Sequence, residues 1–385
     1  MTTGASVGAK NLSSTQSFLE GNEAIARGAM AAGCRFFAGY PITPATSIYH
    51  QMLQLLPPVG GVCMQGEDEI ASIGFCLGAS MAGLKAMTAT SGPGISLYSE
   101  QLSFAVGGEI PLVVIDVQRL GPSTGSATKG ADGDIQFLRW GNSGGLPVIV
   151  LAPVDVRDCF LLTVHAFNLA EQFRCPVFIA SNKEIGMTKE SVDLEGLILP
   201  EPIDRKPCPV DHSGKPFAVL PGESVPPFLP IGGDRLSRQT SSSHGEDGYI
   251  TTDPGTLEAG ILRLQDKLLA AVPDFTFHEY DGTPEDTTLL VVYGVTARAA
   301  RAAVRELRCK GMQVGLLILK TLYPVPEACI RRHLPSKTEI IVIEMNLGQY
   351  VREIERLAGT VPVRFYGRMN GELISPKSII EQVMS

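Results

Sequence analysis

Residues 111–119 have the sequence Pro-Leu-Val-Val-Ile-Asp-Val-Gln-Arg, a nearly continuous apolar stretch that ends in polar side chains. A strand that is apolar at almost every position is typical of a parallel sheet buried on both faces. Similar stretches occur at Lys85–Thr90, Leu146–Leu151 and Pro176–Ala180. Helical patterns separate them, so the alternation predicts an α/β fold with a parallel sheet covered by helices on both faces.

Helices are expected between these strands. Asn22 can cap a helix that runs to Ala32, and Gly33 ends it. Thr43 followed by Pro44 has the pattern of an N-cap with proline at the first helical position, which predicts a helix from about Pro44. The other elements expected in this region are a short buried strand at Phe36–Tyr40 and helices at Asp68–Met81 and Asp155–Gln172.

Composition divides the 385-residue chain into four parts. We expect an N-terminal tail at 1–17, a first α/β domain at 18–199, a Pro/Gly/Ser-rich connecting arm at 200–255, and a smaller α/β domain at 256–385. Nine prolines between Pro200 and Pro230 favour a plain connector over a partner-binding arm. The second domain is expected to contain a leading helix (Thr256–Ala271), strands at Leu289–Tyr293, Val314–Leu319, Glu339–Glu344 and Val361–Tyr366, and helices at Thr296–Arg308, Pro326–Leu334, Gln349–Leu357 and Ser375–Met384.

Charge and cysteine usage exclude several classes of function. The net charge of −8 argues against nucleic acid or an anionic membrane as a partner. No apolar run approaches the roughly 18 residues of a membrane span, and the first residues lack the features of a secretory signal. The eight cysteines form no C-x-x-C pair, and the six histidines are scattered without metal-ligand spacing. We therefore expect a cytoplasmic protein whose own chain holds no metal.

Two segments precede helices at the expected ligand-binding edge of the first sheet. Tyr40-Pro41-Ile42-Thr43-Pro44 follows a strand, and ligands bind at the carboxyl ends of such strands. Gly66-Glu67-Asp68-Glu69 places three acidic residues at the start of a helix that then becomes apolar. Interaction with the helix dipole explains such acids equally well. A partly buried carboxyl would instead be suited to proton transfer.

Two further segments belong to the same expected edge. Thr88-Ala89-Thr90-Ser91-Gly92-Pro93-Gly94 ends a strand in small residues that allow a ligand to approach the backbone. Arg119 ends the strand quoted first, and its planar guanidinium matches a carboxylate; an ion pair with Asp132 or Asp134 is the alternative. The polar, glycine-rich loop Gly121–Gly133 that follows has the character of a lid or of a mobile loop.

Taken in their order along the chain, these segments form a highly specific combination with two later ones, Asn182–Met187 and Glu344–Gln349. The combination resembles the α subunit of 2-oxoacid:ferredoxin oxidoreductases, especially the 2-oxoglutarate type, from about Leu19 to the end of the chain. The resemblance implies that the first domain is the pyrimidine-binding half of a thiamine diphosphate-binding fold. It also implies that the second is similar to the carboxy-terminal domain of transketolases.

The resemblance also implies roles for individual residues. Glu69 matches the glutamate that hydrogen-bonds the aminopyrimidine ring of thiamine diphosphate, with Glu67 as its competitor. Arg119 matches the arginine that holds the substrate carboxylate, and Thr43 the threonine that hydrogen-bonds a substrate oxygen. Lys129 is a candidate for a distal substrate carboxylate. The cofactor-binding positions would further include Pro41, Ile42, Ser91 and Gly92.

Two absences imply a partner chain. The chain has no Gly-Asp-Gly…Asn motif for Mg²⁺ and the diphosphate, since Asp132-Gly133-Asp134 lacks that context, and no cysteine spacing for an iron–sulfur cluster. With these absences, the resemblance implies that a β subunit supplies the diphosphate-binding half, Mg²⁺ and a [4Fe-4S] cluster in an (αβ)2 assembly. The segment 233–248 departs from the family pattern, which weakens any role for His244.

The expected function is CoA-dependent oxidative decarboxylation of a 2-oxoacid, with 2-oxoglutarate the favoured substrate, succinyl-CoA the product and ferredoxin the electron acceptor. Three alternatives stay open: the same reaction on pyruvate or a branched-chain 2-oxoacid, a non-catalytic structural subunit, and a self-contained thiamine-dependent decarboxylase or synthase. The joint presence of Thr43, Glu69 and Arg119 argues against the structural subunit. The missing diphosphate motif argues against the self-contained enzyme.

Overall fold

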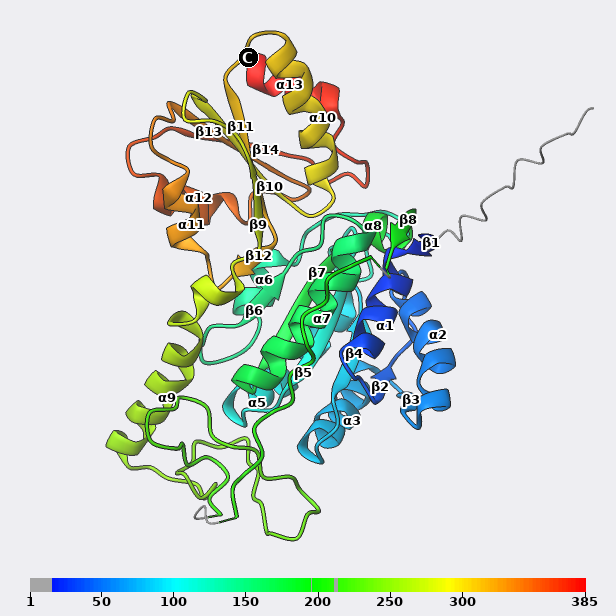
Figure 1. The fold of residues 1–385 in the computed structure, drawn as a ribbon, viewed down its shortest axis with the longest axis vertical. Helices are drawn as coiled ribbons and strands as arrows, with labels where there is room; N and C mark the ends of the chain where they lie inside the picture. Colours follow the sequence, from blue (N-terminus) through cyan, green and yellow to red (C-terminus); the bar gives the residue numbers. More distant parts are fainter. Residues whose placement is uncertain (1–15, 195, 211–213) are drawn as a thin grey trace, which may run out of the picture.

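A computed structural model describes residues 16–194, 196–210 and 214–385 of the chain. Two α/β units lie one above the other, and an irregular arm leads from the lower unit to a long helix, α9 (Pro254–Leu269), that runs up toward the upper unit (Figure 1). Most of the expected tail lies outside the described residues. Its last two residues belong to β1 (Gln16–Glu20), which pairs antiparallel with β8 (Lys189–Asp193).

The larger sheet belongs to the lower unit. Among the described residues it has seven strands in the order β12-β6-β7-β5-β4-β2-β3, parallel except for β12. This confirms the predicted parallel sheet. The strands are β2 (Phe36–Gly39), β3 (Val62–Gln65), β4 (Ala86–Thr90), β5 (Leu112–Gln118), β6 (Ile149–Leu151), β7 (Pro176–Asn182) and β12 (Thr321–Tyr323).

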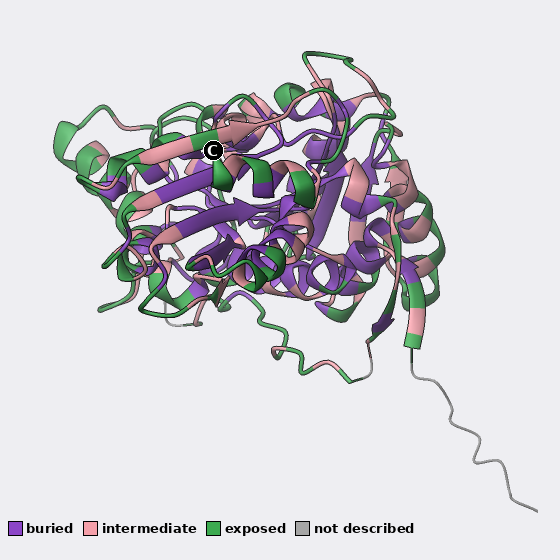
Figure 2. Cartoon of the chain, turned by 90° about the horizontal axis from the view of Figure 1, so that it is seen from above, coloured by how far each residue is buried: buried purple, intermediate pink, exposed green. Residues whose placement is uncertain are grey.

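Alternate residues of β5 enter two separate cores, one on each face of the sheet. Val113 and Ile115 pack with α1 and α7, whereas Val114 packs with α3 and α5. All seven residues of β5 are buried, as its apolar sequence predicts. The strands at the centre of the molecule are drawn in purple, the colour of buried residues (Figure 2). The helices of this unit are α1 (Gly21–Ala31), α2 (Thr46–Leu55), the 3-10 turn η1 (Pro57–Val59), α3 (Glu69–Met81), α4 (Pro93–Leu97), α5 (Ser99–Gly107), α6 (Ile135–Trp140), α7 (Val156–Phe173) and α8 (Lys183–Gly186).

The upper unit contains a smaller sheet. Its order in the described residues is β14-β13-β10-β11-β9, with β9 antiparallel at the edge. Helix α10 packs with α13, and α11 packs with α12. The elements are β9 (His278–Asp281), β10 (Thr288–Tyr293), α10 (Thr296–Cys309), β11 (Val314–Leu319), α11 (Glu327–Arg332), β13 (Glu339–Glu344), α12 (Val351–Ala358), β14 (Val363–Gly367) and α13 (Pro376–Met384), preceded by the turn η2 (Val272–Phe275).

Both predicted helix caps in the first unit are wrong. Asn22 is fully buried inside α1, and its Nδ2 donates hydrogen bonds to Pro44 O at 2.9 Å and Ser47 Oγ at 2.8 Å. The Thr43–Pro44 peptide is cis, and α2 begins only at Thr46 without a side-chain cap. The Asn22 amide therefore holds the segment between β2 and α2 against α1.

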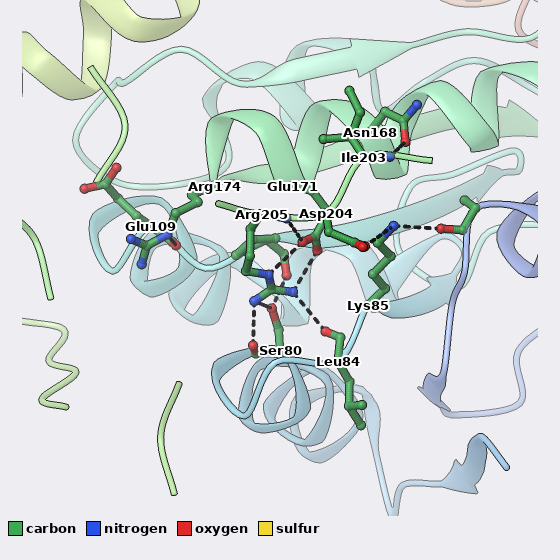
Figure 3. A network of polar contacts seen from close by, with 12 residues as sticks. Ser80, Leu84, Lys85, Glu109, Asn168, Glu171, Arg174, Ile203, Asp204 and Arg205 are labelled. Carbon is green, nitrogen blue, oxygen red and sulfur yellow. Dashed lines mark hydrogen bonds and ion pairs between the residues drawn. The ribbon is translucent and has the colours of Figure 1, made fainter. Parts of the chain in front are cut away.

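The connecting arm is tied to the lower unit through Arg205, as Figure 3 shows. Its guanidinium Nε and Nη2 each donate to a carboxylate oxygen of Glu171 on α7 at 2.7 Å. Nη1 donates to Ser80 O at 2.7 Å and Nη2 to Leu84 O at 3.0 Å, both at the end of α3. Both charged side chains are buried, with 5% and 3% of their area exposed. The arm is therefore ordered at this point, and it lies across two helices.

A second buried ion cluster joins the turn after α5 to α9. The Glu109 carboxylate is fully buried and accepts from Lys267 Nζ at 2.9 Å and Arg263 Nη2 at 2.5 Å. Burial alone would raise the pKa of Glu109, but Lys267 and Arg263 together lower it to about 2. The charged form is therefore stabilised by folding.

This cluster predicts loss of stability in acid. In the folded protein the pKa of Glu109 lies below its ordinary value of 4.5. The contribution of Glu109 to the free energy of unfolding is therefore complete above pH 4.5 and is lost as the pH falls toward about 2. The shift corresponds to about 3 kcal/mol. Urea unfolding between pH 6 and pH 3 should show a loss of about 2 kcal/mol for the wild type, the part of the shift titrated by pH 3, and a flatter profile for Glu109→Gln. Parallel profiles for the two proteins would contradict the assignment.

None of the helices in the described ranges combines the length and the apolar character needed to cross a bilayer.

Candidate active site

Three predicted segments follow neighbouring strands of the larger sheet. Tyr40–Pro44 follows β2, Ser91–Gly94 follows β4, and Arg119 follows β5. These strands are parallel and adjacent, so their carboxyl ends share one edge of the sheet. The topology therefore brings the segments together where ligands bind in open α/β folds.

Arg119 connects all three segments. Its side chain is 5% exposed, and Nη1 donates a hydrogen bond to Thr43 O at 2.5 Å. Gly92 has φ +56°, and a Cβ built there would lie 2.6 Å from Nε of Arg119, so this position needs glycine. Burial lowers the pKa of Arg119, while Asp134 and Glu69 oppose that effect. Within the described residues Arg119 forms no ion pair with Asp132 or Asp134, although the charge of Asp134 acts on it, and its Nε has no hydrogen-bond partner.

Glu69 occupies the first position of α3. Asp68 caps the helix, its Oδ1 accepting from Ala71 N at 2.7 Å, and this fixes the orientation of the first turn. The Glu69 side chain is buried, at 7% exposure, whereas Glu67 is exposed. A Cβ at Gly94 would lie 2.8 Å from Oε1 of Glu69, so the carboxylate lies against the turn after β4. Burial therefore distinguishes the two glutamates.

Several polar atoms beside these residues have no hydrogen-bond partner in the described part of the chain. They are Nε of Arg119, Oγ1 of Thr90 and Oγ of Ser91, and all three residues are buried. Buried polar atoms normally have partners, and a polar ligand supplies them when it binds. Together with Glu69 they form a set of buried donors and acceptors that a polar ring can satisfy, while the glycines at 92 and 94 leave room for the side chains of Arg119 and Glu69. Pro41, Ile42 and Thr43, which are partly or fully exposed, flank this edge.

The predicted lid loop is partly ordered. Leu120 N donates to Lys129 O at 2.8 Å, and Ser126 N donates to Leu120 O at 2.8 Å, which closes the loop on itself. A Cβ at Gly371 would lie 2.7 Å from the Cβ of Lys129, so the stem of this lysine lies against the upper unit. The Lys129 side chain is exposed. His244 lies apart from this edge, with its ring 3.8 Å from that of Phe217 on the connecting arm.

A buried acidic network behind Arg119 was not predicted. Asp116 on β5 is fully buried, and neither carboxylate oxygen has a partner among the described residues. Burial, with Asp134 and Asp132 nearby, raises the pKa of Asp116 well above its ordinary value. Burial also raises the pKa of Asp132 to about 7 and that of Asp134 to about 6. An acid inside an otherwise apolar strand was the available signal in the sequence.

Asp132 also joins the two units. Its Oδ1 accepts from Asn182 Nδ2 at 2.7 Å, its N donates to Met345 O at 2.9 Å, and its O accepts from Asn346 Nδ2 at 2.8 Å. Asn346 in turn donates to Glu344 Oε2 at 3.0 Å. The motifs at 182–187 and 344–349 therefore meet at the end of the predicted lid.

Two family models match the chain. The thiamine diphosphate-binding domain of pyruvate flavodoxin/ferredoxin oxidoreductases matches residues 27–256. Core domain II of pyruvate:ferredoxin oxidoreductase matches residues 287–379. The 2-oxoglutarate synthase subunit KorA of Methanocaldococcus jannaschii is 41% identical over 95% of this chain and 99% of its own length. The chain belongs to the 2-oxoacid:ferredoxin oxidoreductase family.

Other relatives place the chain within this family. KorA of Archaeoglobus fulgidus is 41% identical over 95% of this chain and 97% of its own length. The ketoisovalerate oxidoreductase subunit VorB of Methanothermobacter marburgensis is 33% identical over 95% of this chain and 96% of its own length. The predicted family is confirmed, and identity is higher to the 2-oxoglutarate synthase subunits than to VorB.

Solved structures agree with the fold. The 2-oxoglutarate:ferredoxin oxidoreductase from Magnetococcus marinus, with 2-oxoglutarate, coenzyme A and succinyl-CoA bound, superposes with a TM-score of 0.90 at 34% identity. The match covers 96% of this chain and 65% of that one, so this chain spans about two thirds of the Magnetococcus chain. A split-gene transketolase superposes over 96% of this chain with a TM-score of 0.55 at 12% identity. The predicted thiamine diphosphate-binding fold with a transketolase-like second domain is confirmed.

Proposed function

We propose that this chain is the α subunit of a 2-oxoglutarate:ferredoxin oxidoreductase, which converts 2-oxoglutarate and CoA to succinyl-CoA and CO₂ with ferredoxin as electron acceptor. The observation that carries the proposal is identity of 41% to a 2-oxoglutarate synthase subunit over almost the full length of both chains. The edge described above supports it, because a buried arginine and a buried glutamate converge there with small residues.

Glu69 is proposed to act on the cofactor. Thiamine diphosphate, when bound, supplies the carbanion that adds to the 2-oxo group and accepts the electrons left by decarboxylation. The buried Glu69 carboxylate would hydrogen-bond a ring nitrogen of the bound cofactor and share a proton with it. Because the site is shielded from water, this hydrogen bond is stronger than it would be in solvent. Ser91, Gly92, Pro41 and Ile42 are proposed to line the same pocket.

Arg119 is proposed to bind the carboxylate next to the 2-oxo group. Its Nη1 is held by Thr43 O, while Nε has no partner among the described residues and can donate to a substrate oxygen. The Thr43 hydroxyl, at the same turn, is proposed to hydrogen-bond a substrate oxygen. Lys129 is the proposed partner of the distal carboxylate that distinguishes 2-oxoglutarate from pyruvate.

Replacing Arg119 by alanine should weaken substrate binding. A charge-assisted hydrogen bond contributes about 1.5–3 kcal/mol, so the KM for 2-oxoglutarate should rise roughly 10- to 150-fold. Initial rates of viologen reduction by the assembled enzyme measure this. Arg139→Ala, on α6 and outside this edge, is the matched control and should leave KM unchanged. An unaltered KM in Arg119→Ala would remove this residue from the carboxylate site.

The remaining parts of the enzyme are proposed to reside on a β subunit. The chain has no cysteine pair with cluster spacing, and Asp132–Asp134 serves the contact between its own two units. The β subunit would supply the diphosphate-binding half, Mg²⁺ and a [4Fe-4S] cluster. The assembly is proposed to be (αβ)2 and cytoplasmic, with the active site between α and β chains.

A further inference from the structure

Three side chains of the upper unit form a cluster that sequence spacing did not reveal. One ligand atom each of His278, Cys329 and His333 lies within 4.8 Å of the others. Cys329 and His333 are four residues apart on α11 and its C-cap, so they share one face of a helix. His278 begins β9, the edge strand of the smaller sheet, and α11 is drawn beside that end of the sheet (Figure 1).

The hydrogen bonds around the cluster leave nitrogen lone pairs free. The Nδ1 of His278 lies 3.4 Å from Thr276 O, a contact in which Nδ1–H donates and Nε2 keeps its lone pair. The Nε2 of His333 is buried and has no partner in the described ranges. Its ring stacks on Tyr280 with centroids 3.9 Å apart, which holds the imidazole in place. His278 therefore has the arrangement of histidines that bind metals in proteins, in which one ring nitrogen donates to a carbonyl and the other is free.

A metal ion that binds this cluster has to displace the proton of the Cys329 thiol. Burial raises the pKa of Cys329, and Arg332 partly opposes that rise. A metal ion lowers the pKa of a thiol that it binds and removes the remaining cost of forming the thiolate.

We propose that His278, Cys329 and His333 bind a tetrahedral divalent metal ion of the Zn²⁺ class, with water in the fourth position. Thiolate and imidazole are the ligands that Zn²⁺ prefers, at distances of about 2.0–2.3 Å. A tetrahedral site then needs ligand atoms roughly 3.3–3.8 Å apart, within reach of small side-chain rotations from the observed spacing. The metal would clamp β9 to α11. The metal site lies on other elements than Glu69 and Arg119, and the proposal of a metal does not depend on the proposed function.

Zinc titration of the full chain in its purified complex tests the site. After treatment with a chelator, Zn²⁺ alone is added in competition with a chromogenic chelator, and binding is compared among variants. We expect each chain to bind one Zn²⁺ ion tightly. The affinity for Zn²⁺ should fall more than about 100-fold in Cys329→Ser and in His333→Gln, because loss of a direct ligand costs more than loss of a residue that only supports a ligand. Cys309→Ser, which changes an exposed cysteine outside the cluster, should keep it.

Two further readouts separate binding from folding. Co²⁺ in place of Zn²⁺ should give thiolate-to-metal charge-transfer absorption that disappears in Cys329→Ser. Zn²⁺ should raise the Tm of the wild type but not that of the variants, whose Tm without metal reports whether they fold. The proposal is overturned if the wild type and both variants bind Zn²⁺ equally well, or if the wild type binds no Zn²⁺ ion tightly.

Discussion

Glu69→Gln is expected to lower kcat of the assembled enzyme about 10²- to 10⁴-fold, the usual contribution of a positioned general acid or base. Glutamine keeps the shape of the side chain at the start of α3 but cannot accept a proton. The substitution should therefore leave the fold and the substrate KM nearly unchanged while slowing exchange of the thiazolium proton. Steady-state kinetics and hydrogen–deuterium exchange of the bound cofactor measure both effects.

Glu67→Gln is the matched control for this experiment. Glu67 lies two residues earlier and is exposed, whereas Glu69 is buried against the turn at Gly94. The control should retain kcat within about twofold, because exposed carboxylates away from a ligand contribute little. An unchanged exchange rate in Glu69→Gln together with a slow rate in Glu67→Gln would transfer the role to Glu67.

Arg205→Ala is expected to destabilise the chain by about 3–5 kcal/mol, because it leaves the buried Glu171 carboxylate unpaired. The same substitution removes the donors to Ser80 O and Leu84 O at the end of α3. The arm should then separate from the lower unit. Urea unfolding of the purified protein measures the free-energy change, and limited proteolysis between residues 200 and 253 should accelerate.

Lys206→Ala provides the comparison on the neighbouring residue. Lys206 pairs with Glu223 at the surface, with 55% of its side chain exposed, so its loss should cost no more than about 1 kcal/mol. The double variant Arg205→Met/Glu171→Leu should recover much of the lost stability, since no unpaired charge stays buried. Equal destabilisation by Arg205→Ala and Lys206→Ala would contradict the assigned role of the buried pair.

The regular part of the fold follows directly from sequence pattern. The apolar run at 111–118 and its neighbours predicted the parallel sheet, because strands buried on both faces are apolar at almost every position. β12 was missed because three residues carry no periodicity, and it joins a sheet formed by a distant part of the chain. The helix cap at Asn22 was wrong because α1 begins one residue earlier, at Gly21, so Asn22 lies inside the helix, where its Nδ2 donates to Pro44 and Ser47.

Part of the candidate active site could likewise be predicted from the sequence, and part could not. Segments that follow strands could be placed at one edge by topology alone, and Arg119 does contact the segment that contains Thr43. The Asp116–Asp132–Asp134 network could not be placed, because its members come from a strand and a loop whose meeting depends on the upper unit. The same holds for His278, which reaches Cys329 and His333 only after β9 pairs with β11. Residues joined by tertiary packing leave no local signature.

The most direct test of the proposed function is CoA-dependent reduction of ferredoxin or a viologen by the co-purified complex. The substrates to compare are 2-oxoglutarate, pyruvate and 2-oxoisovalerate. We predict that kcat/KM for 2-oxoglutarate exceeds the other two by at least about tenfold, the effect of one satisfied charged contact. The α chain alone should show no turnover. A preference for pyruvate or 2-oxoisovalerate would contradict the assigned substrate, and turnover by the isolated chain would contradict the shared active site.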